Sequence, residues 1–135
     1  MKVLLSIKPQ FAEKIFNGTK KYEFRKAIYK NKSIKTIVVY ASYPVQKVIG
    51  EFSVEHVLSN HPDILWEKTK AHSGISEDYF GQYFADRNVG FAIKVAETRQ
   101  YAEPLCLKED FNISFPPQSF MYLEDWNASA LIKIF

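Results

Sequence analysis

Three side chains in the basic stretch KKYEFRK could act together on one ligand: Lys20, Glu23 and Arg25. Side chains two apart in a strand share one face, so Glu23 and Arg25 would project about 6 to 7 Å apart. Lys20 stands where the strand begins, and the pleat does not fix its direction. Cations beside a carboxylate suit a binding site or acid–base chemistry. They equally suit an exposed strand face with weakly paired charges, and the spacing alone does not separate these readings.

The segments around this stretch predict how it is positioned. Residues 3–7 are short, apolar and rich in β-formers, and Pro9 then suits the first turn of a helix. An apolar stripe over residues 11–16 stops at Gly18, a typical C-terminal signal. We therefore expect a strand, a brief helix and a second strand over residues 20–26.

The remaining chain predicts further strands with helices inserted between them. Residues 33–59 indicate two strands paired as a hairpin, in which Gly50 marks a bulge, a barrel bend or a close backbone approach. Residues 61–87 have helical spacing in two segments, residues 89–101 return to a β pattern, and residues 130–135 form a strand-like apolar hexamer. This order predicts an α+β fold with a mainly antiparallel sheet closed into a small barrel.

The composition predicts one globular domain over residues 1–135. Hydrophobic residues make up 47% of the chain, and no apolar run approaches the length of a membrane span. A single cysteine excludes an intramolecular disulfide and a cysteine-based zinc site, and we expect a cytoplasmic location. The three histidines lack metal-ligand spacing, so we predict neither a metal nor a cofactor. The net charge of +3 is a weak indication of a polyanionic partner.

The stretch SIKPQFAEKIFNGTKKYEFRK resembles the ASCH domain family. The signature of that family is a Ser and a Pro flanking the end of the first strand, then a helix, then G-x-K-x-x-E-x-R. The matching residues here are Ser6, Pro9, Gly18, Lys20, Glu23 and Arg25. The stretches VVYASYPVQKVIGEF and PPQSFMYL also resemble small bacterial and phage members. This resemblance implies a PUA-like β-barrel with a cleft where the first helix, the charged strand and neighbouring loops meet.

The resemblance implies that the cleft binds RNA or a modified nucleotide. In such a cleft Lys20 and Arg25 would meet phosphate or a carbonyl, and Glu23 would orient Arg25 or accept from an exocyclic amine. Lys8, at the end of the first strand, is a fourth candidate. Protein partners are not indicated.

A small hydrolase is the alternative. One branch of the family is similar in a Lys-x-x-Thr-x-Arg strand and acts as an amidohydrolase on acylated cytidine, but this chain has Glu23 in place of the Thr nucleophile. The covalent mechanism therefore does not carry over, although Glu23 could act as a general base with Lys20 as the electrophilic partner. Other members are associated with ribonuclease activity.

Three further residues are candidates beside the cationic cleft. Tyr40 and Ser42 share one strand face near the expected barrel mouth, and Gln118 stands on a loop with Phe120. An aromatic ring and an amide there could stack on a base and read its edge. Core packing is the alternative for Tyr40. A purely structural reading also stays open, in which Glu23 and Arg25 form a buried pair that ties the sheet to the helix.

Overall fold

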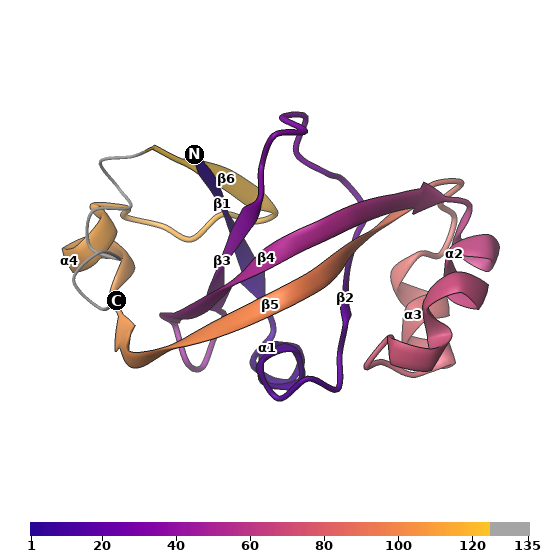
Figure 1. Cartoon of the computed structure of the whole chain (residues 1–135), viewed down its shortest axis with the longest axis horizontal. Helices are drawn as coiled ribbons and strands as arrows, with labels where there is room; N and C mark the ends of the chain where they lie inside the picture. The colour runs from indigo at the N-terminus through magenta and orange to yellow at the C-terminus, as the bar shows by residue number, and fades with distance from the viewer. Residues whose placement is uncertain (125–135) are drawn as a thin grey trace.

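The computed structural model describes residues 1–124, which form a mixed α+β fold with one six-stranded sheet (Figure 1). The strands are β1 (Lys2–Ile7), β2 (Tyr22–Arg25), β3 (Thr36–Ala41), β4 (Lys47–Asn60), β5 (Gly90–Leu105) and β6 (Phe120–Leu123). The helices are α1 (Pro9–Phe16), α2 (Pro62–Thr69), the 3-10 helix η1 (Lys70–His72), α3 (Glu77–Tyr83) and α4 (Leu107–Phe111). The strand predicted at residues 130–135 lies outside the described residues.

The strand, helix and strand expected at the N-terminal end are confirmed. Pro9 begins α1, which buries Ala12 and Ile15 against the sheet. Gly18 then takes a φ of 86°, a left-handed conformation that costs glycine little. The chain reverses there, and β2 pairs antiparallel with β5. The position of the charged strand therefore follows from a short helix and one glycine.

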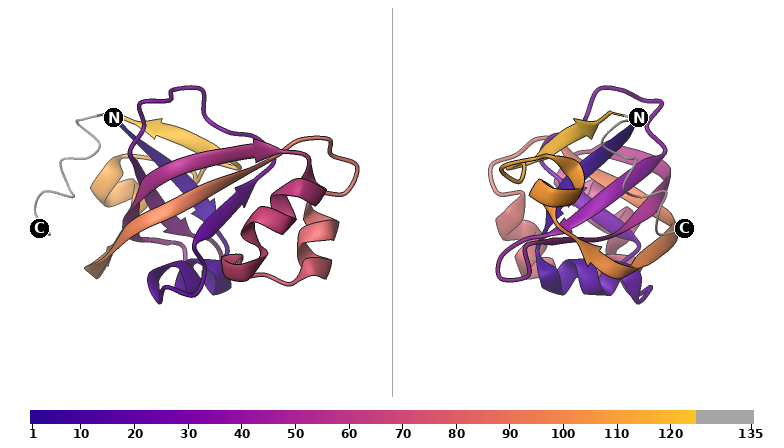
Figure 2. Two further views of the ribbon diagram at one scale, coloured as in Figure 1. Left: turned by 45° about the vertical axis from the view of Figure 1, so that its right-hand side comes forward. Right: turned by 90° about the vertical axis from the view of Figure 1, so that its left-hand side faces the viewer.

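The closed barrel expected from the sequence is wrong, because the sheet stays open. Its strand order is β2-β5-β4-β3-β1-β6, with only β1 and β3 parallel among the described pairs. The long strands β4 and β5 shift register at three places, and the sheet curls so that β2 approaches β1 (Figure 2). Over Val3–Leu5 both edges of β1 are taken, one by β3 and the other by β6. β2 makes no backbone ladder with β1, and the Arg25 side chain reaches β1 just beyond this part, at Ser6.

Gly50 marks two of the three features that its place in a strand predicted, a bulge and a close backbone approach. The pairing of β4 with β5 shifts register between Val48 and Gly50. A side chain at Gly50 would also place its Cβ 2.6 Å from the Arg99 carbonyl oxygen and 2.6 Å from the Phe16 ring. Glycine therefore lets α1 lie close against the curled sheet.

The two predicted helical segments are α2 and α3, which lie together at one end of the molecule, with α4 at the other (Figure 1). Phe80 of α3 and Phe84, which caps its C-terminal end, pack on Phe24 of β2, with ring centroids 5.1 and 6.3 Å from that of Phe24. The sequence missed α4 and placed Phe120 on a loop, whereas Phe120 begins β6 and pairs with Leu5. None of the helices within residues 1–124 is long and apolar enough to span a membrane.

Candidate functional site

A cleft of about 250 Å³ lies where the ends of β1 and β2 meet α1 and α3. Five of the predicted site residues line it: Lys8, Lys20, Glu23, Arg25 and Gln118. They come from segments far apart in the sequence, and the curl of the sheet brings these segments together. The cleft therefore joins the charged strand to three other parts of the chain.

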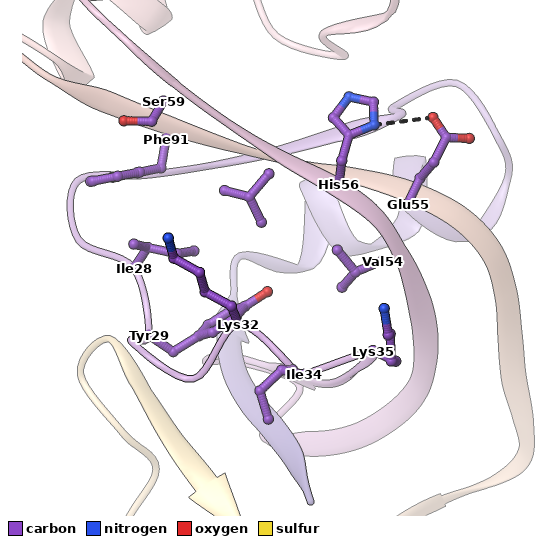
Figure 3. Close-up of a pocket in the computed structure, with 11 residues that line it drawn as sticks. Ile28, Tyr29, Lys32, Ile34, Lys35, Val54, Glu55, His56, Ser59 and Phe91 are labelled. Atoms are coloured by element: carbon purple, nitrogen blue, oxygen red, sulfur yellow. Dashed lines mark ion pairs between the residues drawn. The ribbon is translucent and has the colours of Figure 1, made fainter.

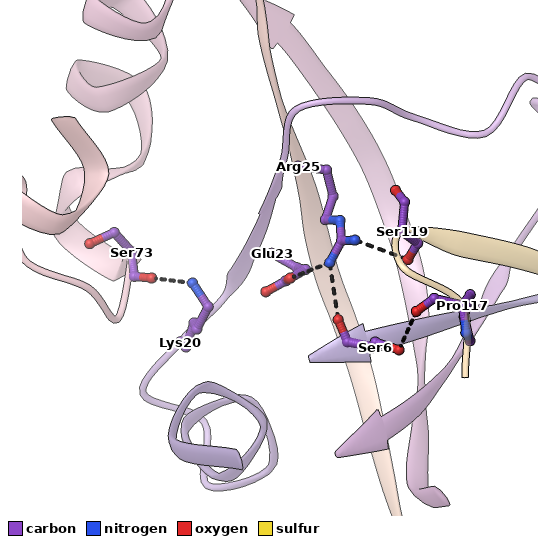
Figure 4. Close-up of polar contacts among 7 residues, drawn as sticks. All are labelled: Ser6, Lys20, Glu23, Arg25, Ser73, Pro117 and Ser119. Atoms are coloured by element: carbon purple, nitrogen blue, oxygen red, sulfur yellow. Dashed lines mark hydrogen bonds and ion pairs between the residues drawn. The ribbon is translucent and has the colours of Figure 1, made fainter. Parts of the chain in front are cut away.

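Arg25 spans the gap between β2 and β1 with its side chain (Figure 4). Its Nη1 donates to the Ser6 carbonyl oxygen at 3.3 Å, and its Nη2 donates to the Ser119 carbonyl oxygen at 2.9 Å. Nη1 also lies 3.3 Å from Oε2 of Glu23, and the two side chains are only 11% and 8% exposed. Three of the five N–H donors of the Arg25 guanidinium are therefore bonded to the protein. The guanidinium fixes the open edge of the sheet and holds Glu23 in the cleft.

Lys20 is buried, with 2% of its surface exposed. Its Nζ donates to the Ser73 carbonyl oxygen at 2.8 Å (Figure 4) and lies 4.6 Å from the centroid of the Phe24 ring and 5.5 Å from that of Phe11. An ammonium has three N–H donors, and residues 1–124 supply one hydrogen-bond acceptor. The aromatic faces stabilise the charge, and two donors remain for a ligand in the cleft.

Burial lowers the pKa of Lys20 to about 8. The negative charge of Glu23 acts in the opposite direction, and the nearby charge of Lys14 adds to the lowering. The amine therefore changes charge close to neutral pH, as a cation below about pH 8 and as a neutral base above it. Such a group can serve either as an electrostatic partner for an anion or in proton transfer.

The rim of the cleft combines cations with aromatic rings. Lys8 is exposed, and its Nζ lies 5.5 Å from the centroid of the Tyr79 ring. It also precedes α1, whose first turn carries neither an acidic residue nor a side-chain cap. The positive end of that helix therefore adds to the charge of Lys8. Tyr83 completes this side of the cleft, and burial raises the pKa of its hydroxyl.

Tyr40 and Ser42 do not join this group. Tyr40 is 4% exposed and packs in a hydrophobic cluster with Leu4, Val38 and Val48. Ser42 follows β3 in a turn, where its N–H donates to the Ile7 carbonyl oxygen. The structure therefore places Tyr40 in the core and Ser42 outside the cleft.

An aromatic wall that was not predicted from the sequence lines the cleft, formed by Phe11, Tyr79 and Tyr83. The signal was present, because Tyr79 and Tyr83 are four residues apart in a helical pattern and share one face of α3.

Among residues 1–124, no three His, Cys, Asp or Glu side chains gather closely enough to hold a metal ion.

The profile of the ASCH domain family matches residues 5–105, three quarters of the chain, including the end of β1, the charged strand and the cleft-forming helices. The chain belongs to the ASCH domain family. A solved ASCH structure from Zymomonas mobilis is similar to this ASCH domain with a TM-score of 0.89 and 27% sequence identity, over 98% of this chain and 94% of that one. The α+β fold is therefore supported by a solved relative.

Relatives of this ASCH domain differ widely in length. An ASCH domain-containing ribonuclease of Zymomonas mobilis is 28% identical over 97% of this chain and 90% of its own length. An ATP synthase subunit alpha of Ureaplasma parvum is 31% identical over 90% of this chain, which spans only 15% of that protein. The chain likewise spans 39% of a large ribosomal subunit protein uL22 of the same species.

Gly74 packs directly against the side chain of Lys20 and helps to bury it. It has a φ of 70°, and a Cβ there would lie 2.4 Å from the Cβ of Lys20. We expect Gly74→Ala to lower the free energy of unfolding by about 1 to 2 kcal/mol, because alanine is strained at this φ and collides with the lysine. Urea denaturation measures the change.

Gly81 supplies the matched control for this substitution. It lies in α3 with no atom within 4 Å of the position of its Cβ, so Gly81→Ala should raise stability by about 0.5 to 1 kcal/mol. Equal effects of the two substitutions would show that Gly74 does not confine Lys20.

Proposed function

We propose that this ASCH domain binds RNA in the cleft. The observation that carries the proposal is the combination of Lys8 and Lys20 with the rings of Tyr79 and Tyr83 around one small cavity. Lysines attract the phosphate backbone, and aromatic rings stack on bases whatever their sequence. A volume of about 250 Å³ suits one nucleotide-sized group rather than a duplex.

The geometry divides the roles among the lining residues. Lys20 would donate its two remaining N–H groups to phosphate or carbonyl oxygens, and exposed Lys8 would pair with a neighbouring phosphate. Gln118 is exposed at the edge of the cleft and can read a base edge with its amide. Arg25 would act mainly through Glu23 and the strand edges, since three of its five N–H donors already bond to the protein.

Cleavage of the bound RNA is the second candidate. It is supported by the ribonuclease name of the Zymomonas mobilis relative, which the chain matches over nearly all of its length. Glu23 would take the proton of a ribose 2′-hydroxyl, whose oxygen then attacks the phosphorus as the bond to the 5′-oxygen breaks. Water protonates the leaving 5′-oxygen, and the products are a 2′,3′-cyclic phosphate and a 5′-hydroxyl. The Lys20 ammonium would stabilise the charge that develops on the phosphate. Hydrolysis of an acylated nucleoside by the same pair stays a prediction that no finding tests.

A fluorescence-anisotropy titration of a short single-stranded RNA tests the proposal. The parent should bind saturably, with an affinity that falls as salt rises. Lys8→Ala should weaken binding at every salt concentration and reduce the slope of log K against log salt by about 1, because one phosphate contact is lost. Gel analysis of the same samples reports cleavage, which Glu23→Gln should abolish if Glu23 is the base.

Lys108→Ala is the matched control, since Lys108 is exposed on α4 at the far end of the molecule. It removes the same charge and should leave the affinity within about twofold of the parent. Equal losses for Lys8→Ala and Lys108→Ala would mean that RNA binds by net charge alone, and the cleft would be the wrong site.

A further inference from the structure

A second and larger cavity, of about 480 Å³, opens beyond the far end of β2 (Figure 3). Its walls come from the loop between β2 and β3, from β4 and from the start of β5. We call it the Tyr29 pocket, after the tyrosine that lines it. Ile28, Ile34, Val54 and Phe91 provide its apolar surface. It shares no lining residue with the cleft.

Tyr29 carries a polar group that the fold does not use. The residue is 6% exposed, and its hydroxyl is buried without a hydrogen-bond partner among residues 1–124. Figure 3 shows the side chain entering the space between the loop and β4. A buried hydroxyl without a partner destabilises the fold, and a ligand that pairs with it recovers that energy. Burial raises the pKa of Tyr29, so the hydroxyl remains protonated at neutral pH and can donate.

The charges around the Tyr29 pocket favour an anion. Lys32 and Lys35 line it, both are exposed, and neither has an ion-pair partner within residues 1–124. The one acid among its lining residues, Glu55, lies 2.9 Å from Lys94 and 3.4 Å from His56. The charge of Lys94 thus offsets that of Glu55, while Lys32 and Lys35 remain for a ligand.

We propose that the Tyr29 pocket is a second binding site, which takes a flat nitrogen heterocycle carrying an anionic group, as in a nucleoside monophosphate. The ring lies between the apolar walls beside Phe91, and one of its edge nitrogens or carbonyls accepts from the Tyr29 hydroxyl. The anionic group meets Lys32 and Lys35 at the rim. Neither an apolar ligand nor a bare phosphate would use all three features.

The ligand of the Tyr29 pocket is either a free mononucleotide or one nucleotide of an RNA strand. The RNA strand as ligand rests on the proposed function. One strand could reach both the cleft and the Tyr29 pocket, because Arg25 lines the cleft and Ile28 lines the pocket. Three residues span at most about 10 Å, which is short enough for one RNA strand to reach both sites. Arg25 and Phe91 are also direct partners across β2 and β5.

NMR titration of the whole chain with AMP, CMP, GMP, UMP and inorganic phosphate tests the proposal. At least one nucleotide should shift the amide signals of residues 28–35 saturably, and at least about tenfold more tightly than phosphate. Tyr29→Phe should weaken that nucleotide about tenfold through the loss of one hydrogen bond. The pair Lys32→Ala and Lys35→Ala should weaken it at least as much, and Lys108→Ala should not. The melting temperature of Tyr29→Phe should equal or exceed that of the parent.

Three results would overturn the proposal: no saturable nucleotide binding, an unchanged affinity in Tyr29→Phe, or a melting temperature that Tyr29→Phe lowers. A short RNA identifies the source, since Tyr29→Phe weakens its binding if the pocket takes part of a strand and leaves it unchanged if the ligand is free. Lys20→Met separates this site from the cleft, because mononucleotide binding at Tyr29 should survive it. The absence of RNA binding in the cleft and the absence of nucleotide binding in the Tyr29 pocket can therefore be told apart.

Discussion

Arg25→Ala is expected to lower the free energy of unfolding by about 3 to 5 kcal/mol. The substitution removes the three contacts through which the guanidinium joins β2 to Ser6 and Ser119 and pairs with Glu23. It also leaves the Glu23 carboxylate, which is 8% exposed, without its closest counter-charge. Stranding a buried charge costs more than losing an exposed pair, so the loss should be large. Urea denaturation followed by circular dichroism measures it.

Two further variants separate the cost of leaving the Glu23 carboxylate unpaired from the loss of the Arg25 contacts between the strands. Arg87→Ala removes an exposed arginine and should change stability by less than about 0.5 kcal/mol. The double variant Glu23→Gln with Arg25→Ala should recover part of the loss, since no buried carboxylate is then left unpaired. If Arg25→Ala stayed within about 1 kcal/mol of the parent, the side chain would not be holding the open edge of the sheet.

The sequence predicted the part of the site that depends on local pattern. Glu23 and Arg25 are two residues apart in a strand, and the strand follows from the alternation of Tyr22 and Phe24 with charged residues. Both side chains line the cleft, as that spacing requires. Lys8 and Gln118 were also predicted, and they reach the cleft because β1 and the segment before β6 end beside β2.

The rest of the site depends on contacts between distant segments. The direction of Lys20 is determined by the Ser73 carbonyl, 53 residues away, and by the close approach of Gly74. Arg25 is held by two backbone carbonyls, which every residue carries and no pattern distinguishes. The barrel failed for a similar reason, because β6 pairs with Lys2–Leu5 of β1 through backbone groups that no sequence pattern distinguishes.

Lys20→Met is expected to stabilise this ASCH domain while removing its RNA binding. Burial moves the pKa of Lys20 from 10.5 to about 8, and each unit corresponds to about 1.4 kcal/mol of cost for the charged form in the folded state. Methionine fills similar space without a charge, at the expense of the hydrogen bond to the Ser73 carbonyl. The net gain at pH 7 should be about 2 to 3 kcal/mol, and RNA affinity should fall about tenfold or more.

The stability of the parent should depend on pH in a way that the stability of Lys20→Met does not. Below about pH 8 Lys20 is charged in both the folded and the unfolded state, so the full free-energy cost of burying its charge is present. Between about pH 8 and 10.5 the unfolded chain holds the extra proton, so the stability of the parent rises with pH. Lys20→Met lacks that rise, and because both proteins share the same tyrosines, the difference between their stability curves isolates Lys20.

RNA binding should follow the opposite course, since the ammonium that attracts phosphate disappears as pH rises through about 8. Cleavage at saturating RNA should decline over the same range if Lys20 acts as a cation, and should increase if its neutral amine acts as the base. A variant less stable than the parent at pH 7, with parallel stability curves, would show that the buried amine serves the fold. The cleft would then lose the residue on which its proposed function most depends.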